Sequence, residues 1–470
     1  MADPGVVALV RAGGSDARRE DLARLASLLG WDEEGRGAFG RVIPQGARVV
    51  VKPNLVLHEN QGGSGIEPLV TDPALIRAVA EEALRARASS VVVGDAPIQG
   101  CDFERLLDLT GLGAWAAETS ARDARFTGVL DFRRTTCTFV DGVRVAMEEL
   151  QPEERFVLFD LGASSLLEPV TDEGGMGRFR VTCYDPRLMQ ATHARGRHRY
   201  LVARDLLEAD VVINLPKLKT HKKAGITCAL KNLVGINGNK EFLPHHRVGS
   251  AAQGGDCYEE TSVLRRSIEY ALDRQNMTSS RAAARALHTT TRQLHRLGRL
   301  AKQDTDTEGS WWGNDTVWRM CLDLNRILLY GGPDASLEDE VRRRVVHVVD
   351  GDVAGQGNGP LAPERLDLGL LVGGGNAGAV DWVGARLLDY DPRAISLTRE
   401  AFGDFRWPLT TFAQDEIRLE GDLGAGAAEA VLDDLPPVPV RHPVGWRTAA
   451  RTGLGDREPV TAGVEEGIPE

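Results

Sequence analysis

Short apolar runs alternate with amphipathic segments along the first half of the chain. The runs are rich in Val, Ile and Leu, and they predict buried strands at residues 6–12, 47–56, 90–97, 157–161 and 209–216. Helical spacing predicts a helix over 15–29. A second helix is expected to start with Thr71 as its N-cap and Pro73 in its first turn, and to end near residue 87. Such strands separated by helices are typical of an α/β fold, with mostly parallel sheets flanked by helices.

The pattern changes after about residue 240. Residues 258–303 are rich in Ala, Arg, Leu and Gln and predict helices, and strand patterns return at 345–353 and 366–374. We expect four parts, which are the first part of an α/β domain (1–240), a helical insertion that could form a lid (241–330), the continuation of the α/β domain (331–430) and a C-terminal tail (431–470). The tail is rich in Pro, Gly and Glu, so it either wraps the surface or is partly disordered.

Polar residues follow five of the predicted strands. They are Lys52-Pro53-Asn54, Gly94-Asp95, Asn214-Leu215-Pro216-Lys217, Asp350-Gly351-Asp352 and Gly373-Gly374-Gly375-Asn376. Any one of these groups could simply form a turn. Because ligands of open α/β sheets bind at the carboxyl ends of strands, the five together favour a shared pocket.

Lysine usage singles out one of these strand ends. The chain has 56 basic residues, only 8 of them lysines, and six lysines lie within residues 217–240, where there is no arginine. A solvated basic loop in so arginine-rich a chain would contain arginine, so the segment favours a site that needs ammonium groups. Lysine, unlike arginine, can lose its proton or form a covalent bond. Lys222 and Lys223 are the two expected to be merely exposed.

The segment LPKLKTHKKAGITCALKNLVG (215–235) supplies most of the candidate site. Lys217 and Lys219 would share one face of an extended strand end, and a helix beginning after His221 would direct free N–H groups at an anion. His221 and Lys231 are the candidate catalytic residues, because histidine carries protons near neutral pH and a buried lysine among cations has a lowered pKa. The expected substrate-binding residues are Lys52, Asn54, Asp95, Asn214, Lys217, Lys219, Thr220, Asn232, Lys240, His245 and Asn358.

A metal site is a further hypothesis. Asp350, Asp352 and Asp381 could hold a divalent cation such as magnesium, although each could instead cap a loop. His245-His246 could supply a second proton carrier or, less readily, a metal ligand. The six cysteines show no C-x-x-C spacing, which argues against a local zinc site, an iron–sulfur cluster and a disulfide framework. The cofactor is otherwise unknown.

Two other motifs have weaker implications. The glycine-rich stretches GQGNGP (355–360) and GGGNAG (373–378) fit neither the dinucleotide-binding nor the P-loop pattern. In GSWWGND (309–315), the residues Trp311, Trp312, Asn314 and Asp315 predict either a pocket wall or lid, or a helix cap.

Composition and charge limit the kinds of partner that we expect this protein to bind. The net charge of -12 and the pI of about 5.5 leave no global basic footprint for nucleic acid. No apolar run is long enough for a transmembrane helix, and MADPGVVALVRAGG lacks the pattern of a secretory signal. We expect a cytoplasmic protein that acts on a small anionic molecule rather than on nucleic acid or a membrane, with its oligomeric state open.

Several stretches resemble the uncharacterised family named domain of unknown function 362. In chain order, from about residue 50 to 400, they are KPNLV, TDPALIRAV, VVVGDAP, ADVVINLPKLKTHKKAGITCALKNLVG, DGDVAGQGNGP and AGAVDWVGARLLDYDP. Some relatives carry a ferredoxin-like cluster domain, but the cysteine spacing for one is missing here. The resemblance implies little chemistry, because the activity of the family is largely unassigned.

A shorter stretch is similar to the active-site segment of the nickel-pincer lactate racemases. His221 and Lys231 are spaced as in H-x-x-A-G-x-[ST]-G-x-x-K, with Cys228 in place of the last glycine. The similarity implies that His221 lies in the active site and that Lys231 is where such enzymes hold their cofactor. Since only eleven residues match, we do not expect the nickel-pincer nucleotide itself.

Three hypotheses follow. The leading one is an intracellular enzyme of small-molecule biosynthesis, natural products included, that acts on a carboxylate or phosphate at a Lys/His-rich site after strand 209–216. The second is a cofactor-dependent redox or hydride-transfer enzyme that resembles the racemases. The third is a binding protein for an anionic metabolite, without catalysis.

Overall fold

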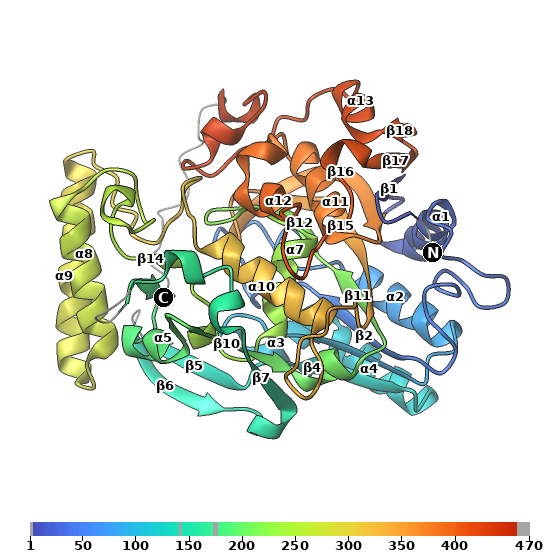
Figure 1. Cartoon of the computed structure of the whole chain (residues 1–470), viewed down its shortest axis with the longest axis horizontal. Coiled ribbons are helices and arrows are strands. Elements are labelled where there is room, and N and C mark those ends of the chain that lie inside the picture. The colour runs from blue at the N-terminus through green and yellow to red at the C-terminus, as the bar shows by residue number, and fades with distance from the viewer. Residues whose placement is uncertain (1–2, 141–142, 173–176, 458–470) are drawn as a thin grey trace.

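A large mixed sheet runs through the centre of the molecule (Figure 1). The computed structural model describes residues 3–140, 143–172 and 177–457. Nine of the eleven strands of the sheet form the path β18 (Gly426–Ala427), β17 (Arg418–Gly421), β1 (Val6–Arg11), β16 (Ala362–Gly374), β15 (Arg344–Asn358), β11 (Val211–Leu215), β2 (Arg48–Pro53), β3 (Ser90–Asp95) and β4 (Phe126–Asp131). The other two are β12 (Lys217–His221), which pairs with β15, and β13 (Gly225–Thr227), which pairs with β12.

The predicted α/β fold with a mostly parallel sheet is confirmed. Strands β15, β11, β2, β3 and β4 are parallel neighbours, as expected for apolar strands that alternate with helices. Strand β16 runs antiparallel to both β15 and β1. The short turn between β15 and β16 forces this direction, because a parallel connection needs a long crossover.

Helices cover both faces of the sheet. In β2, Val49 and Val51 face one core together with α1 (Arg18–Leu28), α2 (Pro73–Arg85), α3 (Phe103–Thr110) and α4 (Leu112–Arg122). Val50 faces a second core with α10 (Val317–Tyr330) and α11 (Ala377–Leu387). This alternation explains why the strands are apolar at every position rather than at every second one.

Strand β12 is an extension of β11 along the same neighbour. Strand β15 pairs with β11 over Arg344–His347, and then with β12, where Asp350 lies opposite Lys217. Pro216 separates β11 from β12, since proline has no N–H to donate to the ladder. The extended strand end expected for Lys217 and Lys219 is present as β12. Where a helix was expected directly after His221, the chain turns into β13 and forms the β12–β13 hairpin.

Smaller sheets lie outside the central one. Strand β7 (Phe156–Asp160) pairs antiparallel with β10 (Arg197–Ala203), which also pairs with β9 (His193–Ala194), so the predicted strand 157–161 lies outside the main sheet. The remaining elements are the strand pairs β5 (Thr135–Val140) with β6 (Val143–Glu149) and β8 (Phe179–Arg180) with β14 (His246–Arg247), and the helices α5 (Pro186–Thr192), α6 (Arg204–Glu208), α7 (Ala229–Asn232), α12 (Ser396–Glu400) and α13 (Ala428–Asp433).

The segment 241–330, predicted as one helical insertion, has two different parts. Helices α8 (Val263–Met277) and α9 (Arg281–Leu300) form an exposed hairpin at one side of the molecule (Figure 1). Helix α10 is almost wholly buried and belongs to the second core. The two parts therefore differ in role, because only α8 and α9 stand away from the core.

The C-terminal segment packs onto the body of the protein. Val440 and Trp446 are buried, and isolated bridges join Gly445 to Trp311 and Ala450 to Tyr390. Residues 458–470, the end of the predicted tail, lie outside the described part of the chain.

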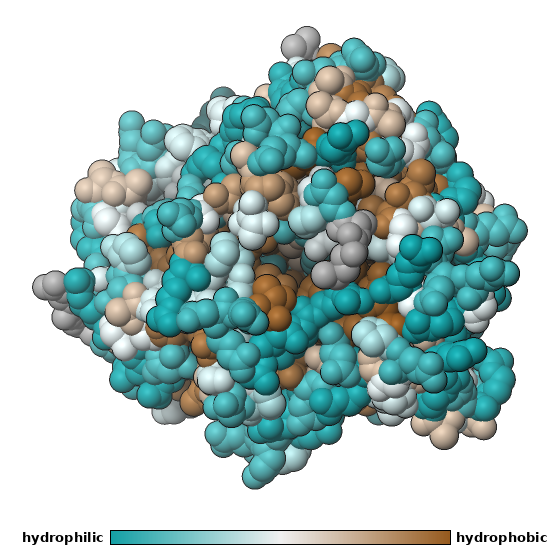
Figure 2. Space-filling view, turned by 45° about the vertical axis from the view of Figure 1, so that its right-hand side comes forward, coloured by the Kyte–Doolittle hydropathy of each residue, from teal (hydrophilic) through white to brown (hydrophobic). Residues whose placement is uncertain are grey.

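Hydrophilic residues predominate on the face of the molecule shown in Figure 2, and hydrophobic residues gather towards its middle. Among the described residues, no helix has both the length and the apolar character needed to cross a bilayer.

Candidate functional site

Lys52 and Asp95 form a buried ion pair where two neighbouring parallel strands end. Lys52 Nζ lies 2.6 Å from Asp95 Oδ1, and neither side chain is appreciably exposed. Lys52 Nζ also donates to the Pro53 carbonyl at 2.8 Å and to Asn232 Oδ1 at 3.2 Å, while Asp95 Oδ2 accepts from Leu55 N at 2.7 Å. Burial lowers the pKa of Lys52, and the charge of Asp95 opposes that shift.

Lys219 is buried, and no carboxylate in the described part of the chain forms an ion pair with it. Its Nζ donates to Asn54 Oδ1 at 2.8 Å and to the Leu69 carbonyl at 2.5 Å. Burial and the charges of Lys217 and Lys231 hold the pKa of Lys219 well below its usual range. Lys217, two residues earlier, instead pairs with Asp350 at 2.5 Å.

Lys231 on α7 acts electrostatically on five basic side chains. Its side chain is 9 % exposed, and its Nζ has neither a hydrogen bond nor a counter-ion within residues 3–140, 143–172 and 177–457. Its charge lowers the pKa of the side chains around it, which are Lys52, Lys219, His221, Lys240 and His245. Burial lowers the pKa of Lys231 itself.

Lys240 completes a group of four lysines. Its Nζ makes one long hydrogen bond, 3.4 Å to the Ala96 carbonyl. Burial lowers the pKa of Lys240 to about 8, with Asp95 opposing the shift and Lys231 adding to it. Asp95 is thus the carboxylate that acts on Lys52, Lys219 and Lys240, so one negative charge serves several ammonium groups. We call Lys52, Lys219, Lys231 and Lys240 the lysine cluster.

Two histidines beside Lys231 have opposite tautomers. His221 Nδ1 accepts from the backbone N–H groups of Lys223 at 3.0 Å and Ala224 at 3.2 Å, so the proton of the neutral ring lies on Nε2. His245 Nδ1 lies 2.7 Å from the Leu243 carbonyl and must donate to it, so its Nε2 carries a lone pair. Burial and the charge of Lys231 hold the pKa of both histidines well below the usual value, which keeps both rings neutral.

The amides of Asn214 and Asn232 link α7 to the sheet. Asn232 Nδ2 donates to Asn214 Oδ1 at 2.7 Å, and Asn214 Nδ2 donates to the Ala229 carbonyl and to His347 Nδ1. These two residues, expected to bind substrate, are occupied by contacts within the protein and position Lys231.

The start of α7 does not provide the predicted anion site. The helix has only four residues, and the carboxylate of Asp381 accepts from Leu230 N at 3.2 and 3.3 Å. Burial raises the pKa of Asp381 to about 7, and this backbone hydrogen bond opposes the shift. A protein carboxylate therefore takes the place that was expected for a ligand.

The three aspartates proposed as metal ligands do not meet. Asp350 pairs with Lys217, Asp352 pairs with Arg18, and Asp381 lies at the start of α7. In the described part of the chain, no group of three or more His, Cys, Asp or Glu side chains is arranged to hold a metal ion. Each carboxylate has a partner of its own, which accounts for its position.

The other predicted residues are placed around the β12–β13 hairpin. Thr220 Oγ1 donates to the Gly357 carbonyl at 2.8 Å, and Asn358 lies where β15 ends. Lys223, expected to be exposed, pairs with Glu308 at 3.0 Å and is largely buried. Its backbone N–H group also donates to His221 Nδ1. The prediction that Lys223 is merely exposed was therefore wrong.

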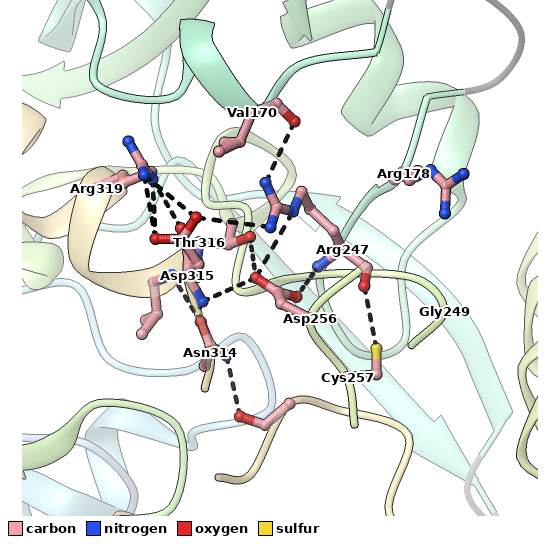
Figure 3. A network of polar contacts seen from close by, with 12 residues as sticks. Val170, Arg178, Arg247, Gly249, Asp256, Cys257, Asn314, Asp315, Thr316 and Arg319 are labelled. Carbon is pink, nitrogen blue, oxygen red and sulfur yellow. Dashed lines mark hydrogen bonds and ion pairs between the residues drawn. The ribbon is translucent and has the colours of Figure 1, made fainter. Parts of the chain in front are cut away.

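The GSWWGND motif caps α10 and supports a polar network (Figure 3). Asn314 Oδ1 accepts from the backbone N–H groups of Thr316 and Val317, and its Nδ2 donates to the His245 carbonyl. Asp315 lies between Arg247 and Arg319 in the same view. The helix-cap alternative therefore describes Asn314, which also steadies His245.

The family described as domain of unknown function, DUF362, matches residues 49–150 and 168–386. The chain belongs to this family. No curated protein matches the sequence. A crystal structure of a Thermotoga maritima protein, a structural genomics target, matches with 11% identity over 75% of this chain and 53% of that protein, at a TM-score of 0.28. The chain thus spans about half the length of that protein.

The DUF362 match contains the whole lysine cluster and both histidines. It ends at residue 386, before the C-terminal segment that packs beside them. The similarity to the nickel-pincer racemases stays a prediction that rests on eleven residues of this DUF362 protein.

Sequence reasoning assigned no role to Gly235, the glycine that leaves room for the ion pair. A Cβ at this position would lie 2.0 Å from Asp95 Oδ1 and 2.6 Å from Lys52 Nζ. The glycine five residues before Lys240 in K-N-L-V-G is therefore required by the close approach of the backbone to the pair.

We expect Gly235→Ala to lower the free energy of unfolding by about 1–3 kcal/mol, because the methyl group displaces a buried ion pair. Urea denaturation measures this change. Gly375→Ala is the matched control, since its Cβ would have nothing within 4 Å. Equal effects of the two substitutions would contradict the role assigned to Gly235.

Proposed function

We propose that this DUF362 protein is an enzyme that binds a small anionic substrate, a carboxylate or a phosphate, at the lysine cluster. One observation supports the proposal above the others, which is that a single carboxylate, Asp95, acts on three lysines of the cluster, while Lys231 is buried without a partner among the described residues. Burying an uncompensated ammonium group is costly, so such a group either loses its proton or attracts an anion.

Lys231 is the proposed reacting amine. It has no partner among the described residues, retains some exposure, and has a lowered pKa, so a larger fraction is neutral near pH 7 than for a free lysine. A neutral amine can remove a proton or attack a carbonyl carbon.

The two histidines extend the proposed chemistry. His221 presents an Nε2–H that can donate to a substrate oxygen, and His245 presents an Nε2 lone pair that can accept a substrate proton. In this proposal one neutral histidine donates a proton to the bound anion, and the other histidine or Lys231 accepts a proton from it.

Anion binding at the cluster should weaken as pH rises. Because an anion favours protonated lysine, its affinity is greatest below the pKa of the free site, which is about 8 for Lys240. Without an anion the sign is opposite. The unfolded chain binds more protons than the folded chain between pH 8 and 10.5, so Lys240 makes the free energy of unfolding rise with pH over that range.

Sulfate, whose charge is constant here, is the probe for this prediction. We expect it to raise the melting temperature more at pH 6.5 than at pH 9, relative to sodium chloride of equal ionic strength. Lys240→Gln should flatten this dependence, whereas Lys302→Gln, at an exposed position, should not. A sulfate effect that is the same at both pH values would contradict anion binding at the cluster.

Lys231→Met should abolish turnover while leaving the fold intact. A panel of small carboxylates and phosphates is first screened for a rise in melting temperature, and mass spectrometry then shows which compounds are consumed. We expect the substitution to lower the rate at least ~100-fold, because acid–base groups commonly contribute that much. Lys302→Met is the matched control.

The outcomes separate the alternatives. Full turnover by Lys231→Met would refute the role of this amine, and a compound that stabilises the protein but is never consumed would favour a binding protein without catalysis. An added mass on Lys231 in the purified protein would instead favour the cofactor-dependent redox enzyme.

A further inference from the structure

A tight turn after β12 fixes the orientation of His221. The backbone N–H groups of Lys223 and Ala224 both point at Nδ1 of the ring. Lys222 N donates to the Gly359 carbonyl at 2.9 Å, which ties the same turn to the end of β15. The direction in which His221 Nε2–H points therefore depends on the position of three successive peptide groups.

Trp446 also holds this turn. Its indole Nε1 donates to the Lys222 carbonyl at 2.5 Å, and its side chain is buried. A Cβ on Gly225, which has φ +80, would lie 2.9 Å from a carbon of the Trp446 ring. The indole thus binds one end of the turn and packs against the other.

The segment that carries Trp446 is anchored independently. Arg441 N donates to Gln356 Oε1 at 2.9 Å, and the Arg441 carbonyl accepts from Gly357 N at 2.8 Å. On the other side, Gly445 bridges to Trp311. This segment lies beyond the DUF362 match, so it contributes to the site from outside the family region.

We propose that Trp446 is a positioning residue, which holds the 222–225 turn so that His221 keeps its Nε2–H tautomer beside Lys231. The proposal rests on the proposed function only in giving His221 a part in turnover. Trp446 does not itself touch the substrate. It acts through the Lys222 carbonyl and through its contact with Gly225.

Nitrogen-15 NMR of the histidine rings tests the proposal directly. The His221 signals are assigned as those that disappear in His221→Asn, and in the unchanged protein they should show the Nε2–H tautomer. Trp446→Phe keeps most of the ring but removes the indole N–H. We expect it to mix the tautomers of His221, and to lower kcat at least ~10-fold with little change in KM.

Gly225→Ala tests the same contact from the other side. Gly30→Ala is its matched control, because Gly30 also has a positive φ, +62, but its Cβ would have nothing within 4 Å. Both substitutions place a Cβ on a residue with a positive φ, but only the Cβ of Gly225→Ala would meet the indole. Trp312→Phe, at a half-exposed indole, controls for the loss of a tryptophan.

The outcomes are distinct. A His221 spectrum that is unchanged in Trp446→Phe and Gly225→Ala refutes the proposal, even if both variants melt at lower temperature. A changed spectrum in both, but not in Gly30→Ala or Trp312→Phe, supports it. If His221→Asn retains full turnover, the proposed part of His221 in function fails, while the NMR result still decides whether Trp446 positions the ring.

Discussion

Burial of ammonium groups with too few carboxylates is the constraint around which this site is built. Asp95 is placed at the end of β3 to meet Lys52, and Gly235 lacks a side chain so that the pair can form. Lys219 and Lys231 have no such partner among the described residues. Burial therefore favours the neutral amine of each, unless an anion compensates the charge. The packing around the lysine cluster is therefore determined by the placement of charges as well as by the burial of apolar side chains.

The choice of lysine over arginine follows from the same constraint. Arginine does not lose its proton, so a buried guanidinium keeps its positive charge and needs carboxylates or other acceptors around it. Arg18 is as buried as the cluster, and it has three carboxylates within 4 Å, those of Asp21, Asp72 and Asp352. Among the described residues no carboxylate pairs with Lys231, and a side chain that can become neutral suits such a position.

The sequence predicted the parts of the fold and site that depend on local pattern. Buried parallel strands are apolar at successive positions, so β2, β3, β11 and β15 were recognisable, and their carboxyl ends brought Lys52, Asp95 and Lys219 together. Contacts between distant segments were not recognisable. Asp72, not Thr71, caps α2, because Thr71 Oγ1 instead donates to the Leu215 carbonyl at 2.7 Å and accepts from Asn54 N.

The least predictable part of the site is the part that fixes direction. A neutral histidine has two possible tautomers, and the hydrogen-bond partners of the ring decide which one is present. For His221 those partners are two peptide groups nearby, but the turn that presents them is held by Trp446, more than 200 residues further along the chain. The concentration of lysines in residues 217–240 pointed to the candidate site. Which ring nitrogen of each histidine carries the proton depends on three-dimensional contacts that no local sequence pattern encodes.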